Sequence, residues 1–444
     1  MTTQIFMAST LYGTATLAAA LDTECFRPAA RRILLISNNA ATPETAPALD
    51  EMPGFERLRG RFDEVISWNE TISPFHPGGW SPRLDDVPLW ERHLRLLWNL
   101  GDDDVELAVE SIQVHPALGF AQIFTGAPVT VYADGLMSYG PTRNKIDPLV
   151  GTRIDRLLHL DLVPDLKPLL LTEFGVEAEI VPTDAFVKVL AELVDTGDTL
   201  PAIEEPALLL GQYLSALGIL TAEEEEDLHV RMLNGAVALG HTKVVFKPHP
   251  SAPARWSRGL EKEAERLGAD LTVLDTPVLA EVLYQRMRPA LVVGCFSTAL
   301  LTASALYGLP VARVGTSTLL DRLAPYENSN RVPVTIVDAL LPELGDRAAV
   351  TSQKPGTMVA DLNGLVRAVG FAMQSKIYPS LRAETAVYLT KHLSAHTLRY
   401  FKRRRLTSLG LPGGIPVQLA FIPRNATVRR VARRARSLKR ATLG

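Results

Sequence analysis

The feature that most constrains the fold of this chain is a repeated alternation of short apolar runs with segments of helical periodicity. In the first half, the helical pattern covers Leu11–Leu21, Trp90–Leu100 and Ala185–Val194, the last with Thr183 or Asp184 as a candidate cap. The apolar runs around these segments are Gln4–Ala8, Arg32–Ser37, Glu64–Trp68, Val105–Val109, Val129–Tyr132, Arg156–Leu160 and Ala178–Val181. Because strands that alternate with helices form parallel sheets, this half predicts a parallel α/β domain.

The alternation resumes after a polar stretch at residues 195–205, which is a candidate hinge. Strands are expected at Ala207–Leu210, Thr242–Phe246, Leu271–Leu274, Leu291–Val293 and Val311–Val314, and helices at Ala222–Leu239, Arg255–Leu267, Pro277–Met287 and Ser297–Tyr307. Because 444 residues exceed what one core usually supports, two domains are expected. The sequence therefore predicts an α/β protein with two Rossmann-like parallel-sheet domains, residues 1–195 and 196–380, facing across a cleft. Closing helices (residues 360–400 read as helical) and a basic tail would occupy residues 381–444.

Several classes of site are disfavoured by the residue types present. Cys25 and Cys295 are the only cysteines, so neither a disulfide framework nor a thiolate metal site is indicated. The histidines lack the spacing of a zinc site, and the chain contains no phosphate-loop or Gly-x-Gly-x-x-Gly motif. We therefore expect no metal. The cysteine usage, together with the lack of a secretory pattern at the N-terminus, favours a cytoplasmic location.

One uncharged segment, residues 289–312, is as long as a membrane-spanning helix. Gly294, Ser297, Gly308 and Pro310 interrupt it, however, and a strand, turn, helix, turn and strand account for every interruption. The segment is therefore expected to be a buried α/β unit.

The charge distribution is strongly uneven. Residues 401–444 contain 12 of the 46 Lys and Arg and none of the 49 Asp and Glu. A basic tail on an acidic body is typical of an interaction segment, and Thr427–Leu443 can form a helix with one thin apolar stripe. Anionic lipid headgroups are the expected partner, which would place the protein at the inner face of the membrane. Nucleic acid is not expected because no nucleic-acid-binding fold accompanies the tail, and a solvated end is the alternative.

Two strand-like runs in the second domain end at polar residues suited to hold a phosphate. One leads into Lys247-Pro-His249-Pro250, and the other leads to Ser297 and Thr298 at the start of a helix. Ligands of parallel sheets bind beyond the carboxyl ends of the strands, and a helix N-terminus favours an anion. The pattern predicts a nucleotide phosphate site. The alternatives are a solvated lysine, a turn histidine and an ordinary helix cap.

A third run, in the first domain, ends in Ala133-Asp134-Gly135. Gly135 permits a backbone turn that would expose Asp134 at the end of its strand. A carboxylate in that position would lie opposite the phosphate site. The alternative is a turn aspartate that caps the next segment.

These three motifs, in this order, resemble those of the bacterial sialyltransferases, in particular the α-2,8-polysialyltransferase-like group. That group has an acidic-acidic-Gly, a His-Pro and a Ser-Ser/Thr motif, which correspond here to Ala133-Asp134-Gly135, His249-Pro250 and Ser297-Thr298. The resemblance covers most of residues 1–380 and includes Ile5–Ser9, Leu210–Tyr213 and Ala280–Leu283. It departs at the first acidic position, which is Ala133 in this chain.

The resemblance implies a GT-B fold and an inverting, metal-independent glycosyltransferase. The donor would be CMP-sialic acid or a related CMP-linked nonulosonic acid as co-substrate, with no other cofactor, and the acceptor a capsule or cell-surface glycan, lipid-linked or free. Asp134 would be the general base on the acceptor side, and His249 would donate a proton or hydrogen bond to the departing phosphate. The expected contacts to the phosphate and ribose of the donor are Ser297, Thr298, Pro250, Lys247, Glu281 and Gly135.

Other readings remain open at this point. Transferases that use CMP-linked 3-deoxy-octulosonic acid and polymerases that use CDP-glycerol place similar residues around a nucleotide phosphate. A non-catalytic relative that binds a glycan or nucleotide is the third reading, and Ala133 is the residue that favours it. For Glu281, a position on the surface of its helix is the alternative to a ribose contact.

Overall fold

The computed structural model describes residues 1–133, 135–194, 200–249, 257–274, 276–352 and 361–415. Every strand expected from the sequence is present, within two residues of its expected ends. The strands are β1 Thr2–Ala8, β2 Arg31–Ile36, β3 Glu64–Ser67, β4 Asp104–Glu110, β5 Val129–Ala133, β6 Ile154–Leu160, β7 Glu177–Val181, β8 Ala207–Leu210, β9 Lys243–Lys247, β10 Asp270–Val273, β11 Leu291–Gly294 and β12 Val311–Arg313.

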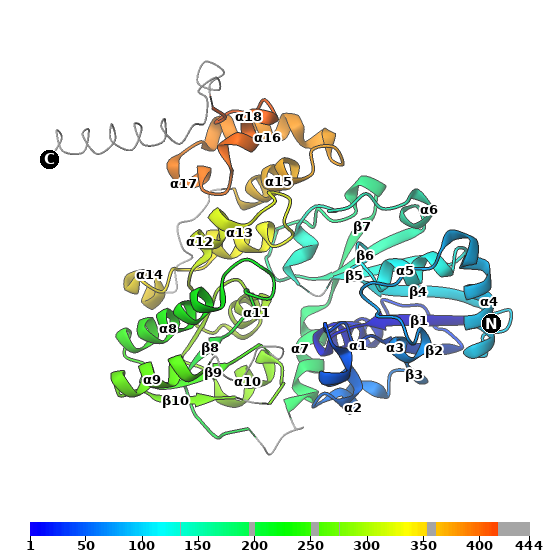
Figure 1. Cartoon of the computed structure of the whole chain (residues 1–444), viewed down its shortest axis with the longest axis horizontal. Coiled ribbons are helices and arrows are strands. Elements are labelled where there is room, and N and C mark those ends of the chain that lie inside the picture. Colours follow the sequence, from blue (N-terminus) through cyan, green and yellow to red (C-terminus); the bar gives the residue numbers. More distant parts are fainter. Residues whose placement is uncertain (134, 195–199, 250–256, 275, 353–360, 416–444) are drawn as a thin grey trace.

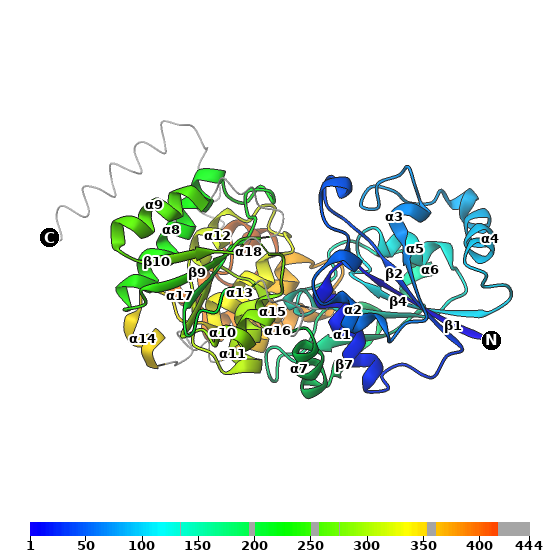
Figure 2. The ribbon, with the colours of Figure 1, turned by 90° about the horizontal axis from the view of Figure 1, so that it is seen from below.

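The strands form two parallel sheets. The first has the order β3-β2-β1-β4-β5-β6-β7 and the second the order β10-β9-β8-β11-β12, with parallel pairing throughout. Figure 1 shows the two sheets in separate lobes, and Figure 2 shows the lobes side by side. This is the GT-B arrangement of two Rossmann-like domains that the sequence predicted. Of the expected hinge at residues 195–205, residues 195–199 lie outside the described part of the chain.

Helices connect successive strands and cover both faces of each sheet. They are α1 Leu11–Asp22, α2 Phe55–Arg59, α3 Trp68–Thr71, α4 Val87–Leu97, α5 Ala117–Ile123, α6 Pro148–Gly151, α7 Thr183–Glu192, α8 Ala222–Ala238, α9 Ser257–Leu267, α10 Ala280–Met287, α11 Thr298–Tyr307, α12 Thr316–Arg322, α13 Arg331–Leu340, α14 Arg347–Ser352, α15 Leu362–Met373, α16 Arg382–His392, α17 Ala395–Leu398 and α18 Arg403–Ser408. No described helix has the length and apolar character needed to cross a membrane.

The expected cap of α7 was wrong. The helix begins at Thr183, so Thr183 and Asp184 lie in its first turn, and Pro182 occupies the cap position without a side-chain hydrogen bond. Proline fits at this boundary because it has no N–H to satisfy and its φ angle is fixed. Asp184 still favours the helix, since a carboxylate in the first turn complements the dipole.

Alternate side chains of the first sheet belong to two separate apolar cores. Ile5 and Met7 of β1 pack with Phe120 of α5, whereas Phe6 and Ala8 belong to a second core that includes α1 and α7. This second core continues without a break through the second domain and into the C-terminal helices. Contacts between α7 and α10, and between α13 and the 3-10 turn at Leu136–Tyr139, join the two domains. The domains are therefore packed on each other over a shared core.

The first part of the basic tail is also part of this core. Phe401, Leu406 and Leu411 are at most 6% exposed. Arg405 donates hydrogen bonds to the carbonyls of Ala372 and Met373 (2.6 and 3.0 Å), at the end of α15. Residues 401–415 therefore belong to the folded body, because the chain there alternates buried apolar with basic residues, and contact of residues 401–444 with an anionic membrane surface stays a prediction. Residues 416–444 lie outside the described part.

A candidate active site at the switch points of the two sheets

Each sheet has one point at which the strand order reverses, and such a point leaves a space for ligands beyond the carboxyl ends of the two strands involved. In the second sheet it lies between β8 and β11. The loops that follow these strands are joined by a hydrogen bond from the Phe296 N–H to Oε1 of Gln212 (2.9 Å). Residues 295–298, which contain the Ser-Thr motif, therefore begin at the switch point.

The His-Pro motif follows the neighbouring strand, β9, and packs against the loop after β8. The N–H of Gly211 donates to the carbonyl of Lys247 (2.9 Å). A Cβ on Gly211 would lie only 3.2 Å from the Cα of Pro248, so glycine lets the two loops approach. The rings of Tyr213 and His249 lie 6.2 Å apart between centroids. The structure thus brings His249 to the same edge of the sheet as the Ser-Thr motif, as the sequence predicted.

Ser297 caps helix α11, which starts at Thr298. Its hydroxyl accepts a hydrogen bond from the N–H of Ala299 (3.3 Å). Helix α10 supports the same turn from behind, because the Tyr284 hydroxyl donates to the carbonyl of Ala299 (2.8 Å). Both interpretations of Ser297 are compatible with this geometry, since a capping serine leaves other N–H groups of the first turn available to an anion.

Glu281 does not lie on the surface of its helix. It is 2% exposed, and Oε1 accepts a hydrogen bond from the hydroxyl of Thr302 (2.6 Å), one turn beyond Thr298 on α11. Burial raises the pKa of this carboxyl, while the Thr302 hydroxyl and the charge of Lys247 oppose the rise. The surface alternative was wrong, because the first turn of α10 packs into the core. A contact with ribose stays a prediction.

In the first sheet the order reverses between β1 and β4. Here the carboxylate of Glu110, the last residue of β4, accepts hydrogen bonds from the N–H and the hydroxyl of Ser9 (2.9 and 3.0 Å). Thr10 caps α1 immediately afterwards. The sequence analysis missed Glu110 because it ends an ordinary strand with no motif around it. The sequence feature that could have identified Glu110 is an acidic residue at the carboxyl end of a predicted strand.

The two domains also meet where Gly135, which follows β5, contacts Thr298 at the start of α11. A Cβ built on Gly135 would lie 2.8 Å from Oγ1 of Thr298, and the three atoms nearest to it all belong to the Thr298 side chain. Gly135 has an extended backbone conformation, so glycine is needed here for space and not for its φ angle. The first and third motifs are thus in contact. Asp134 and Pro250 themselves lie outside the described residues.

Two basic side chains at this edge, those of Lys247 and His249, have lowered pKa values. Burial, followed by the positive charge of Lys247, lowers the pKa of His249. Burial also lowers the pKa of Lys247 itself, and Glu281 partly offsets this effect. Perturbed groups of this kind are typical of functional sites.

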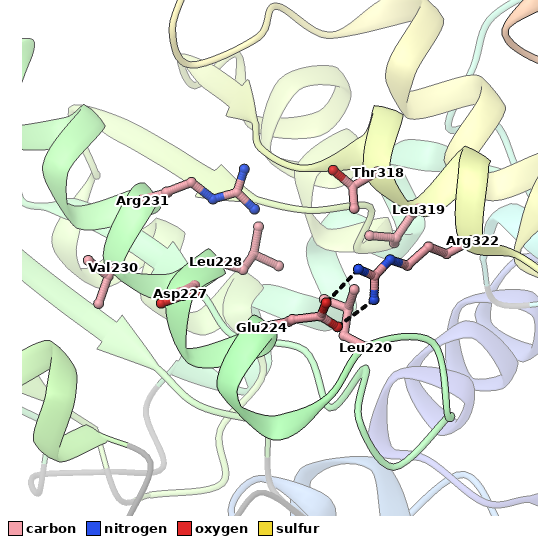
Figure 3. A pocket seen from close by; sticks show the side chains of 9 residues that line it. All are labelled: Leu220, Glu224, Asp227, Leu228, Val230, Arg231, Thr318, Leu319 and Arg322. Carbon is pink, nitrogen blue, oxygen red and sulfur yellow. Dashed lines mark hydrogen bonds and ion pairs between the residues drawn. The ribbon is translucent and has the colours of Figure 1, made fainter. Parts of the chain in front are cut away.

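A separate pocket of about 320 Å³ lies between α8 and α12 (Figure 3). It contains none of the residues predicted for the site. Glu224 and Arg322 form an ion pair across it, and Arg231 lies apart from that pair. The described residues include no group of three or more His, Cys, Asp and Glu that could hold a metal ion.

Comparison with protein families gives one match. The family model for alpha-2,8-polysialyltransferase (POLYST) matches residues 4–316, which include all three motifs. The sequence matches no curated protein.

Among solved structures, similar folds occur with low sequence identity. The GT-B domain of a sialyltransferase from Photobacterium damselae has 12% identity and a TM-score of 0.41, with coverage of 76% of this chain and 96% of that one. The UGT2 protein of Phytolacca americana, complexed with UDP-2fluoro-glucose and pterostilbene, has 12% identity, a TM-score of 0.43 and coverage of 88% and 98%. The UDP-GlcNAc 2-epimerase of Methanocaldococcus jannaschii has 11% identity, a TM-score of 0.44 and coverage of 79% and 91%. At such scores, these similarities do not identify a substrate.

Proposed function

The chain belongs to the alpha-2,8-polysialyltransferase family of glycosyltransferases, and we propose that it transfers sialic acid, or a related nonulosonic acid, from a CMP-activated donor to a glycan acceptor with inversion and without a metal. The observation that carries this proposal is the contact between Gly135 and Thr298. It places the residue after Asp134 against the start of helix α11. A carboxylate of the first domain and a phosphate site of the second would then lie on either side of one bound sugar.

The donor carries its leaving group, a phosphate, on a tertiary anomeric carbon that also bears a carboxylate. As the bond from this carbon to the phosphate oxygen breaks, positive charge develops on the sugar ring. Asp134 removes the proton of the acceptor hydroxyl, whose oxygen bonds to the anomeric carbon from the opposite face. Attack from that face inverts the configuration.

The second domain stabilises the departing CMP. Ser297, Thr298 and the N-terminal amides of α11 bind the phosphate oxygens, on which negative charge accumulates. His249 donates a hydrogen bond or proton to the same phosphate, and Lys247 adds positive potential. Pro250 and Gly135 shape the backbone around the phosphate. Glu281 is assigned to the ribose by the family resemblance alone.

The acceptor belongs to a capsule or cell-surface polysaccharide in this proposal, and basic residues near the C-terminus hold the enzyme at an anionic membrane surface. Eight of the 12 Lys and Arg that follow residue 400 lie within residues 416–444. Electrostatic attraction to anionic headgroups amounts to about 1 kcal/mol for each Lys or Arg near the surface. A cytoplasmic enzyme could in this way reach lipid-linked acceptors.

The test is donor hydrolysis by the purified protein. Release of CMP is followed for CMP-sialic acid and CMP-linked octulosonic acid, and release of CMP or glycerol phosphate for CDP-glycerol, each with and without EDTA. We expect EDTA-resistant release from CMP-sialic acid that is lost in Asp134→Asn and in His249→Ala. Preferential turnover of either of the other donors would move the assignment to that donor.

A second candidate function, binding without catalysis, is favoured by one residue. Ala133 occupies the first acidic position of the family motif. Glu110 supplies a carboxylate at the end of the neighbouring strand, but it is engaged with Ser9. If the protein binds CMP-sialic acid without releasing CMP, and Ala133→Glu restores release, the chain is a non-catalytic relative. If Glu110→Gln alone abolishes release, Glu110 and not Asp134 is the base.

A further inference from the structure

Arg143 is held rigidly at the carboxyl edge of the first sheet. Its N–H donates to Oε1 of Gln113 (2.5 Å), in the loop that follows β4, and its carbonyl accepts from Nε2 of Gln374 (2.6 Å). The preceding residue is fixed as well, because the Thr142 N–H donates to the hydroxyl of the buried Tyr378 (2.9 Å). The backbone around Arg143 is therefore clamped between the first switch point and the C-terminal helices.

The backbone of Arg143 is held by hydrogen bonds, but its side chain has no partner among the described residues. It is half-buried, yet none of the described residues forms an ion pair or a hydrogen bond with its guanidinium. Burial alone lowers the pKa of this group, with no opposing carboxylate. A half-buried charge without a partner costs free energy, so a partner that arrives with a substrate would relieve that cost.

Other half-buried arginines have partners for their guanidinium groups. Arg61 pairs with both Asp22 and Glu192. Arg153 donates four hydrogen bonds to the carbonyls that surround it, the longest of them at 2.8 Å. Arg143 thus differs from these other half-buried arginines. It lies eight residues after Gly135 in the chain, and its backbone is bonded to the loop that follows β4, at the carboxyl edge of the first sheet.

We propose that Arg143 binds the carboxylate of a sugar acid that takes part in the reaction. The inference rests on the proposed function, because a nonulosonic acid carries a carboxylate on the carbon next to its anomeric centre. The planar fork of a guanidinium matches the two oxygens of a carboxylate and binds them in bidentate fashion. Donor and acceptor can both supply this group. The position of Arg143 on the first domain favours the acceptor, whose terminal sugar would be acidic.

The test compares charged and neutral substrates in Arg143→Gln and wild-type protein. The acceptors are an oligosaccharide ending in sialic acid and its C1 carboxamide. We expect Arg143→Gln to raise KM for the charged acceptor by roughly 10- to 100-fold and to leave KM for the carboxamide unchanged. Donor hydrolysis by water should not change. If KM for CMP-sialic acid in hydrolysis rises instead, and KM for its C1 carboxamide does not, the carboxylate is that of the donor.

Lys145→Gln is the matched control, since Lys145 is exposed in the same segment and carries the same charge. Arg143→Lys should recover only part of the affinity, because an ammonium cannot form the bidentate pair. The proposal is overturned if Arg143→Gln weakens charged and neutral substrates equally or changes neither. Binding of a sialic acid dimer, followed by NMR titration, gives the same comparison without catalysis. A wild-type enzyme that hydrolyses no CMP-sugar would therefore refute the proposed function and still leave the role of Arg143 decided.

Discussion

Gly135 and Thr298 touch across the two domains, with only 2.8 Å between Oγ1 of Thr298 and the position that a Cβ on Gly135 would occupy. Gly135 lies two residues after the end of β5 and directly follows Asp134 in the sequence, and Thr298 is the first residue of the helix whose N-terminus is the candidate phosphate site. The separation of a base and a leaving group is critical in a displacement reaction, because reacting atoms must approach to about 3–3.5 Å. The contact between Gly135 and Thr298 limits how far the first domain can lie from the start of α11 at this point.

The first prediction follows from the lack of space at this contact. Gly135→Ala should lower kcat/KM for transfer by about 10- to 100-fold, because the added methyl group must push the start of α11 away from the first domain. The measurement is CMP release with and without acceptor. Gly126→Ala is the control, since a Cβ there meets no atom within 4 Å. Equal activity of Gly135→Ala and the wild type would show that the contact is not important for catalysis.

The second prediction separates the two roles of Ser297. Aspartate is as good a helix cap as serine, so Ser297→Asp should leave the melting temperature close to that of the wild type. A carboxylate beside the phosphate should nevertheless repel the donor and abolish CMP release. Ser297→Ala should instead lose about 0.5–2 kcal/mol of stability with the cap. Normal donor binding by Ser297→Asp, measured by calorimetry, would restrict Ser297 to its structural role.

The third prediction concerns the pH dependence of His249. Its pKa is lowered, so the protonated imidazole is populated only below the usual range of histidine, and a rate that depends on it should fall as the pH rises through that lowered value. Lys247→Met removes one cause of the lowering, so the falling limb of log kcat/KM should move to higher pH. Lys243→Met, on the exposed start of the same strand, is the control and should not move it. An unchanged limb in Lys247→Met would exclude this coupling.

The strands could be predicted from the sequence because parallel strands that are buried on both faces have nearly continuous apolar sequences. Every such run became a strand, and the long periodic segments became α1, α8 and α11. The short helices α2, α3 and α12 were not predicted, because four to seven residues carry too little periodicity to stand out. Packing against the sheets, and not local preference, fixes these helices.

For the site, the motifs predicted which strand ends lie close together. They did not predict how the neighbouring side chains pack around those strand ends. Glu281 was expected at a ligand or at the surface, and its burial against Thr302 depends on how α10 packs on α11. Arg143 was not singled out at all, because a half-buried arginine without a partner can be recognised only when its neighbours are in place. Arg405 was assigned to an interaction tail, since its ties to α15 connect residues more than thirty positions apart.

A fourth prediction arises from His229 on α8. It is 5% exposed, neither ring nitrogen has a hydrogen-bond partner among the described residues, and burial lowers its pKa to about 4. The folded protein therefore excludes a proton that the unfolded chain binds below about pH 6.5. The stability linked to this group should be complete above pH 6.5 and should decrease as the pH falls, by about 2 kcal/mol at pH 5.

Urea unfolding at pH 7 and pH 5 measures this effect. His229→Leu should show a smaller loss of stability on acidification than the wild type, since leucine binds no proton. His93→Leu, at an exposed position of α4, should lose as much as the wild type. The same loss in all three proteins would assign the acid sensitivity to other groups.

The last prediction concerns the division of the basic C-terminal region at residue 415. A chain that stops after Ile415 keeps Phe401, Leu406 and Leu411 in the core together with the hydrogen bonds of Arg405, so its melting temperature should stay within about 2 °C of the wild type. A chain that stops after Tyr400 loses these contacts and should unfold at clearly lower temperature. The chain ending at Ile415 loses eight Lys and Arg and the chain ending at Tyr400 loses all 12, so on the proposed membrane role both should lose binding to vesicles that contain phosphatidylserine. Binding by the full chain should weaken as salt rises and should be absent on phosphatidylcholine alone. If the chain ending at Ile415 still binds anionic vesicles as tightly as the full chain, the membrane contact belongs to the folded body and not to residues 416–444.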